Sequence, residues 1–188
     1  WEQYSCEELN FASKEEGGTL NEALEAIARF NLAKSAKNFS EPVDKTKWEI
    51  TPQTVNCVFG QQANGIYILG AYARGDYYNS EMSDEELLGA LGIMIGHEIS
   101  HAFDSTGAQF DKNGDMRDWW TEEDYAKFLE RNQKMVDYYN AIHPWEGQDL
   151  HGSAMTGEAC ADMAGFKVML RIAADKPDFD YDKFFRAF

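Results

Sequence analysis

Apolar residues recur at helical intervals early in the chain and then give way to two extended runs. Thr19 and Glu22 have the spacing of a capping box, and apolar residues recur every three or four positions after them. A helix is therefore predicted from Thr19 to about Phe39. Two runs rich in β-branched and aromatic residues come next, at 55–59 and 66–72, with glycines between them. Such runs are typical of a hairpin or of two neighbouring strands.

The clearest helix signal lies in the middle of the chain. Ser83 and Glu86 form a second capping-box pair, and from Leu87 the sequence reads LLGALGIMIGHEISHAF, which is apolar on nearly every side. A helix of this kind is buried. It also contains three glycines, at positions 89, 92 and 96. Each glycine weakens a helix by about 1 kcal/mol relative to Ala, so three of them predict a close approach by another part of the chain.

The last third of the chain is predicted to be mostly helical. After Asp104 the sequence is typical of a loop, and Thr121 with Asp124 then begins an amphipathic helix that ends near Ala141. A final helix is predicted from about Thr156 to Ala174. The expected fold class is therefore α+β, with a small, mostly antiparallel sheet packed on the central helix and a mostly helical C-terminal half.

The length and the charge of the chain limit the kinds of molecule that it is expected to bind. The chain has 188 residues, enough for one domain, and carries 17 basic against 33 acidic residues for a net charge of −16. This charge disfavours binding to nucleic acid or to an anionic membrane surface. No apolar stretch is long enough to span a membrane, and no signal-peptide pattern is present. Because the chain opens at Trp1 and stops at Phe188 in mid-pattern, we expect a piece of a longer protein.

The number and spacing of the cysteines argue against two classes of small domain. Cys6, Cys57 and Cys160 are few, odd in number and far apart, which excludes a disulfide scaffold and makes a cysteine zinc site improbable. Free thiols weakly favour a reducing compartment. The sequence does not otherwise indicate where the protein resides.

The most informative motif is His97-Glu98-Ile99-Ser100-His101 in the buried helix. Residues four apart differ by about 40° of rotation and about 6 Å of rise, so both imidazoles can meet one tetrahedral ion. Glu98 lies beside them and can reach a water in the open coordination position. This is the H-E-x-x-H pattern of zinc hydrolases. The alternative, two satisfied histidines without a metal, is costly in an apolar helix.

A catalytic zinc site needs a third protein ligand. The extended pattern with Gly and His after the motif is excluded, because Asp104 and Gly107 occupy those positions. His143 and His151 remain, both in a loop. Glu158 is the stronger candidate, in the first turn of the last helix, with Asp162 four residues later positioned to orient a ligand histidine. The alternative for these two acids is an ordinary solvated helix start.

Three segments together resemble the neprilysin family of zinc endopeptidases: IGHEISHAFD at 95–104, GAQFDKNGDMRDWWT at 107–121 and TGEACADMAG at 156–165. The resemblance implies a zincin-type catalytic core with one Zn²⁺ ion. By position, it implies that His97, His101 and Glu158 are the zinc ligands and that Glu98 is the general base. It also implies that Asp162 hydrogen-bonds a zinc-binding histidine.

The same resemblance implies a peptide-binding strand next to the zinc. Its segment matches Val55-Asn56-Cys57-Val58-Phe59, where Asn56 agrees with the family and Cys57 and Val58 depart from it. The resemblance therefore implies that Asn56 and Cys57 are substrate-binding residues, with Asn56 and the strand backbone holding the main chain of the peptide. The family's downstream His and Arg and its large N-terminal helical portion have no counterpart in the 188 residues. Residues 1–188 are therefore expected to be the catalytic core of a larger metalloendopeptidase, whose remaining chain completes the site.

The function that follows is hydrolysis of peptide bonds in oligopeptides. The alternative is a zinc-containing fragment that binds peptides but is catalytically impaired. Family members occur both in the cytoplasm and outside it, so the resemblance leaves the compartment open.

Three smaller features have structural explanations. The run Asp111 to Asp115 fails the calcium-loop register and predicts a tight turn. Trp119 and Trp120 are expected to pack at a helix entrance. Asp104 either hydrogen-bonds a histidine or marks the end of the helix.

Overall fold

The structure of the chain, a computed structural model, describes residues 9–48 and 50–188. Its residues fall into two compact units that divide after position 49. The first contains α1 (Leu20–Asn38), where Thr19 Oγ1 accepts the N–H of Glu22 and the Glu22 carboxylate accepts the N–H of Thr19. The predicted first helix is thus confirmed, and none of its residues is buried. That residues 1–188 form one catalytic core stays a prediction.

The second unit opens with a β-hairpin. β1 (Cys57–Gly60) pairs antiparallel with β2 (Gly65–Ile68), with Cys57 opposite Ile68 and Gly60 opposite Gly65. The predicted strands exist but are shorter than the apolar runs, because the chain turns at Leu69, which is fully buried. Both strands contact α3, so the small antiparallel sheet packs on the central helix as predicted.

The central helix is assembled from four consecutive pieces. α2 (Asp84–Leu87) begins at the predicted Ser83 cap, a π-helical turn η2 (Leu88–Gly92) follows, and α3 (Ile93–Ser100) continues into the 3-10 turn η3 (His101–Phe103). The sequence predicted one uninterrupted helix. Helical periodicity cannot reveal a single π turn here, because the sequence is apolar on nearly every side of the helix and a shift of register leaves that pattern unchanged.

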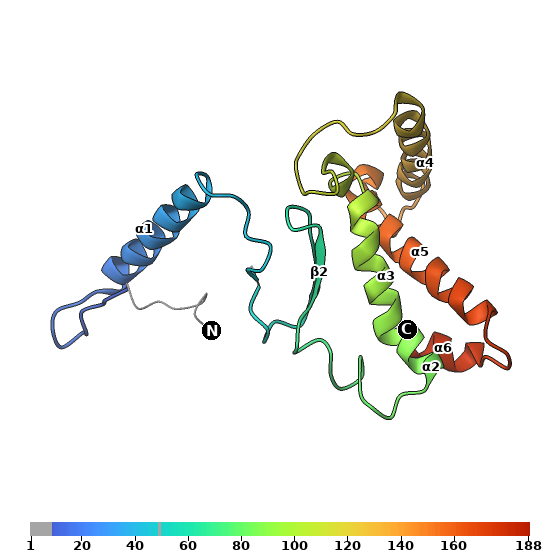
Figure 1. Ribbon diagram of the computed structural model, residues 1–188, viewed down its shortest axis with the longest axis horizontal. Helices are drawn as coiled ribbons and strands as arrows, with labels where there is room; N and C mark the ends of the chain where they lie inside the picture. Colours follow the sequence, from blue (N-terminus) through green and yellow to red (C-terminus); the bar gives the residue numbers. More distant parts are fainter. Residues whose placement is uncertain (1–8, 49) are drawn as a thin grey trace. The chain divides into compact units, whose positions relative to one another are not determined.

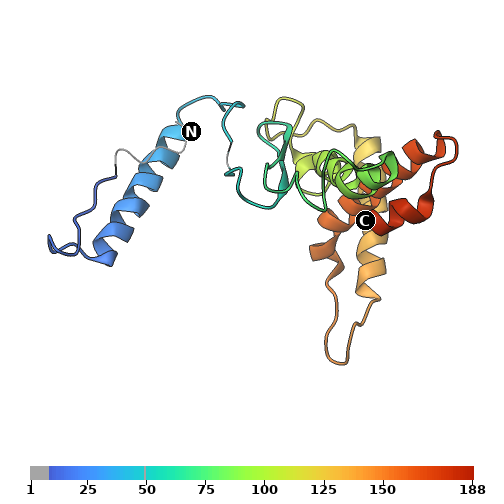
Figure 2. The same ribbon diagram turned by 90° about the horizontal axis from the view of Figure 1, so that it is seen from below.

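The glycines of this helix admit close neighbours, as predicted. A Cβ on Gly89 would collide with the carbonyl of Phe184, and one on Gly96 would lie 2.8 Å from the Cα of Gly165. A Cβ on Gly165 would in turn lie 2.5 Å from the carbonyl oxygen of Ile93. α3 and α5 (Gly152–Ala174) therefore pack backbone to backbone at Gly96 and Gly165, and both views show them side by side (Figure 1, Figure 2).

Three helices complete the unit. α4 (Glu122–Asn140) begins at Thr121 as predicted. α5 begins at Gly152, four residues before the predicted start, because Asn140 Oδ1 accepts the Gly152 N–H at 2.8 Å and so supplies the cap from α4. The loop between α4 and α5 extends away from the helices (Figure 2).

α6 (Tyr181–Ala187) was not predicted, although Asp180 caps it by accepting the N–H of Lys183. The core of the unit gathers side chains from α3, α5 and α6 around Ile93, Met169 and Phe184. Within the described residues, no helix combines the length and the apolar composition that a membrane crossing needs.

The tryptophan pair packs where α4 begins, as predicted. The indole N–H groups of Trp119 and Trp120 both donate to the carbonyl of Ala108, at 3.1 and 2.8 Å. Ala108 belongs to the 3-10 turn η4 (Gly107–Gln109), so this contact ties the start of α4 to the segment that follows the central helix.

Candidate metal centre

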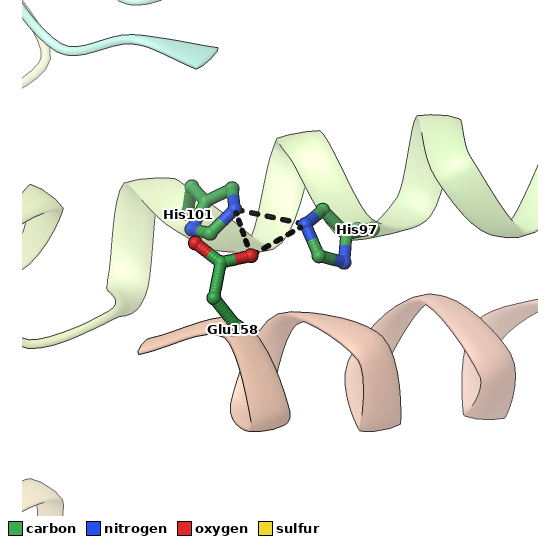
Figure 3. A group of neighbouring side chains, drawn as sticks. All are labelled: His97, His101 and Glu158. Atoms are coloured by element: carbon green, nitrogen blue, oxygen red, sulfur yellow. Dashed lines mark hydrogen bonds and ion pairs between the residues drawn. The ribbon is translucent and has the colours of Figure 1, made fainter. Parts of the chain in front are cut away.

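His97 and His101 leave the same face of the central helix and meet the carboxylate of Glu158 from α5 (Figure 3). The two Nε2 atoms are 2.9 Å apart, and Glu158 Oε2 lies 3.4 Å from the Nε2 of His97 and 3.7 Å from that of His101. One ligand atom from each residue lies within 4.8 Å of the other two. Among the described residues, this cluster includes neither His143 nor His151; the former pairs with Asp149 instead.

The spacing of these three atoms fits a tetrahedral zinc ion. With zinc–ligand bonds of about 2.0–2.1 Å, tetrahedral geometry separates neighbouring ligand atoms by about 3.3 Å. The three measured separations are 2.9, 3.4 and 3.7 Å. Two imidazole nitrogens and one carboxylate oxygen are also the donor set found in catalytic zinc sites.

Each histidine is held from behind by a carboxylate. His97 Nδ1 lies 2.7 Å from Asp162 Oδ1, and His101 Nδ1 lies 2.7 Å from Asp104 Oδ2. A proton on Nδ1 in each of these bonds leaves the Nε2 lone pairs of His97 and His101 facing one another. Such an arrangement is repulsive unless positive charge lies between them, which is what a metal ion supplies.

Asp104 has both of the roles that the sequence left open. It follows directly after η3, where the helix ends, and its Oδ2 contacts the ring of His101. Its Oδ1 accepts the N–H groups of Thr106 and Gly107, each at 2.7 Å. Burial alone would raise the pKa of Asp104, but the hydrogen bonds from His101, Gly107 and Thr106 lower it, so the carboxylate stays ionised.

The surroundings of Glu98 and His101 raise the pKa of both side chains, for different reasons. The hydrogen bond to Asp104 raises the pKa of His101 despite burial, and the nearby Glu158 adds to the rise. Burial raises the pKa of Glu98, which is 4% exposed, while the neighbouring histidines oppose the rise. Glu98 is therefore a stronger base than an ordinary carboxylate.

One edge of β1 faces Glu98. The N–H of Leu69 donates to the carbonyl of Asn56, and because backbone groups alternate along a strand, those of Cys57 and Phe59 point away from β2. A hydrogen bond with the backbone of Phe59 also lowers the pKa of Glu98, which puts this outer edge beside the Glu98 carboxyl.

The two residues expected to contact substrate differ in exposure. Asn56 is exposed immediately before β1, and its Oδ1 accepts the N–H of Cys57 at 2.9 Å. The Cys57 side chain is buried, and burial, together with the charge of Glu98, raises the pKa of its thiol to about 11. Among the described residues it lies outside the candidate cluster of His97, His101 and Glu158, and it is packed in the interior. Cys6 lies outside the described residues.

Residues 56–183 match the model of peptidase family M13. The chain belongs to this family. Neutral endopeptidase of Lactococcus lactis subsp. cremoris is 35% identical over 172 residues, which cover 92% of this chain and 27% of that protein. Neprilysin of Homo sapiens is 34% identical over 140 residues, which cover 73% of this chain and 18% of that protein. The resemblance drawn from the three sequence segments is thereby confirmed.

The fold of an M13 protein of known structure agrees with that of this chain. The zinc metalloprotease Zmp1 of Mycobacterium tuberculosis, solved in complex with an inhibitor, superposes with a TM-score of 0.70 at 29% identity. The match covers 78% of this chain and 25% of that one. The chain thus spans less than a third of the length of these three M13 proteins.

Proposed function

We propose that the chain carries the zinc-binding core, of zincin type, of a metalloendopeptidase that hydrolyses peptide bonds in oligopeptides. The observation that carries the proposal is the convergence of His97, His101 and Glu158 on one point beside the buried Glu98. Membership of peptidase family M13 supports peptide hydrolysis as the reaction class.

In this proposal His97, His101 and Glu158 hold one Zn²⁺ ion. Bound there, zinc would polarise the scissile carbonyl and lower the pKa of a water in its open coordination position to about 7. Asp162 and Asp104 keep the proton of each imidazole on Nδ1, so that both Nε2 lone pairs face the cluster. Each acid thus positions a ligand without binding the metal.

Glu98 is the proposed general base. A carboxylate oxygen of Glu98 accepts a proton from the attacking water and then returns it to the amine that leaves. Burial favours this role, since a raised pKa makes the carboxylate a better proton acceptor near neutral pH and the resulting acid a usable donor.

The outer edge of β1 is the proposed docking surface for the peptide. The carbonyls of Cys57 and Phe59 point outward there, which suits pairing with the N–H groups of an extended substrate, while Asn56 Oδ1 accepts the Cys57 N–H. Asn56 adds an exposed carboxamide at the start of the strand. Main-chain pairing tolerates the buried thiol of Cys57, because that side chain packs inward.

The test compares the wild-type chain with Glu98→Gln. Each is loaded with zinc at neutral pH, its metal content is measured by elemental analysis, and it is incubated with a library of internally quenched oligopeptides. We expect about one zinc per chain in both proteins and turnover at least about hundredfold lower in the variant. Glu146→Gln, in the exposed loop between α4 and α5, is the matched control and should behave as wild type.

Two outcomes contradict parts of the proposal. Full turnover by a zinc-loaded Glu98→Gln would remove Glu98 from the mechanism. A wild-type chain that holds zinc and binds a peptide hydroxamate, yet cleaves none of the library, would favour the alternative function, a zinc-containing peptide-binding unit with impaired catalysis.

A further inference from the structure

The tip of the β1–β2 hairpin rests on a second turn, at 111–115, that comes after the central helix. The Asn64 side chain donates its Nδ2 hydrogen to the carbonyl of Lys112 at 3.0 Å. A Cβ on Gly114 would collide with the carbonyl of Gln62, so the two backbones are in direct contact there. Gly114 has φ +84° and Asn64 has φ +48°, conformations that glycine and asparagine tolerate.

The turn at 111–115 is held rigid from inside, as the sequence predicted for a tight turn. Asp111 is buried, and its Oδ1 accepts the N–H groups of Asn113 and Asp115 at 2.8 and 3.1 Å. Its Oδ2 forms an ion pair with Arg117 Nε at 2.6 Å. The N–H of Gly114 closes the turn on the carbonyl of Asp111. A turn fixed by this many bonds can support another element without yielding.

The residues that lead into this turn are anchored to the end of the helix that carries the H-E-x-x-H motif. Asp104 holds the N–H groups of Thr106 and Gly107 while its other oxygen contacts His101. Gly107 packs so tightly on the carbonyl of His101 that a Cβ would collide with it. Residues 107–117 therefore run from the second histidine of the motif to the tip of the hairpin.

We propose that residues 107–117 form a bracket that fixes the outer edge of β1 relative to Glu98 and the two histidines. In this bracket Gly114 and Asn64 are positioning residues for peptide binding, although neither touches the metal-binding atoms. The inference rests on the proposed function, because it assigns the peptide to the edge of β1. Because the bracket holds the hairpin at its tip, it sets the distance from the outer edge of β1 to Glu98 and the two histidines.

If the bracket positions β1, disturbing it should change the affinity for a ligand that pairs with β1 but not for a ligand that binds only the zinc ion. Acetohydroxamate binds a zinc ion through its hydroxamate group and offers no chain to pair with a strand. A hydroxamate attached to a Leu-Ala dipeptide amide uses the same group and adds main-chain amides that can pair with β1. Displacement of the hairpin should weaken the second ligand and leave the first unchanged.

The first experiment compares Gly114→Ala with Gly147→Ala. Both glycines have positive φ, +84° and +77°, so both variants carry backbone strain, but a Cβ on Gly147 meets nothing within 4 Å. The full chain is loaded with zinc and its zinc content is measured by elemental analysis. The Kd of each hydroxamate is then measured by calorimetry. We expect Gly114→Ala to lose about tenfold in affinity for the dipeptide hydroxamate only, and Gly147→Ala to lose none.

The second variant, Asn64→Asp, keeps the test decisive if Gly114→Ala fails to fold. Aspartate tolerates the same φ but cannot donate to the carbonyl of Lys112. Asn38→Asp adds the same charge at an exposed position of α1 and serves as its control. Hydrogen exchange of the 57–68 amides should be faster in Asn64→Asp than in this control.

The outcomes separate this inference from the proposed function. Unchanged affinity for the dipeptide hydroxamate in Gly114→Ala or Asn64→Asp would overturn the bracket. Equal losses for both hydroxamates, or loss of zinc, would also overturn it, because they would show a general structural role. Failure of the wild-type chain to bind zinc and acetohydroxamate would instead contradict the proposed function.

Discussion

α3 and α5 bring side chains to the same point, but they differ in burial and in how their chemistry is encoded. His97 and Glu98 on α3 are buried and adjacent in sequence, and His101 follows within one turn of helix. Glu158 and Asp162 on α5 have side chains that are 74% and 63% exposed. By burial alone they would be taken for an ordinary acidic helix face.

The comparison shows what each helix contributes. α3 and the turn η3 that continues it carry the complete H-E-x-x-H motif, so the placement of its side chains depends only on helical geometry. α5 contributes only because it crosses α3 closely enough for its acids to reach the histidines. That crossing depends on glycine, since Gly96 and Gly165 let the two backbones touch. The convergence of His97, His101 and Glu158 therefore depends on the helix crossing as much as on the motif.

The largest effect is expected where the crossing itself is broken, in Gly165→Ala. The new Cβ would lie 2.5 Å from the Ile93 carbonyl oxygen and 2.7 Å from the His97 nitrogen, so the helices must separate. We expect zinc affinity to fall by more than about hundredfold and unfolding free energy by about 1–3 kcal/mol. Competition with a chromogenic chelator and urea denaturation measure these two quantities.

Gly157→Ala is the matched control on the same helix. Its Cβ would meet Asp104 at an ordinary 3.7 Å, and the change should add about 1 kcal/mol of helix propensity without affecting zinc. Equal zinc affinity in the two variants would show that the close crossing does not organise the metal-binding atoms.

The next largest effect is expected for the two acids that hold the histidine rings, Asp162 and Asp104, which differ in burial. Asp162→Asn and Asp104→Asn should each lower zinc affinity by about 10- to 100-fold, because each acid holds the Nδ1 of one histidine. Asp104 also satisfies two backbone N–H groups and its side chain is only 10% exposed, so its loss should reduce unfolding free energy by about 1–3 kcal/mol. Asp162→Asn should leave stability nearly unchanged. A stability loss as large in Asp162→Asn would contradict the contrast.

A smaller effect concerns acid stability of the turn that supports the hairpin. Burial would raise the pKa of Asp111, but the backbone bonds from Asn113 and Asp115 and the charge of Arg117 lower it below its ordinary value. Its stabilising contribution is therefore present above the unfolded-state pKa of about 3.9 and is lost as pH falls through the lower, folded-state pKa. Between pH 4 and pH 2.5 the Tm of wild type should fall more steeply than that of Asp111→Asn. Parallel curves would show that Asp111 does not contribute.

The smallest effect concerns the thiol of β1. With a pKa of about 11, Cys57 is almost wholly protonated at pH 8 and should react with iodoacetamide roughly a hundredfold more slowly than in the urea-unfolded chain. Peptide mass spectrometry after timed labelling measures both rates. Labelling of the folded chain at the unfolded rate would show that Cys57 is not packed as the structure has it.

Sequence reasoning succeeded wherever one element carries its own signal. Both capping boxes, the apolar helix and the glycine-separated strands all rest on neighbours within a few residues, and the structure confirms each. The close approach at the helix glycines was also foreseen, although its partner, Gly165, was not.

The rest depends on contacts between distant residues. α5 starts early because Asn140 caps it from α4, and no local pattern near Gly152 shows this. α6 is short, and its stability comes from burying Phe184 in the core rather than from periodicity. Glu158 and Asp162 were candidates from their place in the last helix, but only the resemblance distinguished them from ordinary acids at a helix start, which are common whether or not a metal is near.

The central claim is that α3 and α5 together hold one metal ion, and zinc stoichiometry tests it most directly. Wild type, Glu158→Gln and the exposed control Glu122→Gln are purified, exposed to equimolar zinc at neutral pH, dialysed and analysed for metal. The account predicts about one zinc per chain in wild type and in Glu122→Gln, and loss of most of the zinc in Glu158→Gln. A full equivalent of zinc in Glu158→Gln with undiminished affinity, or no zinc in wild type, would contradict it.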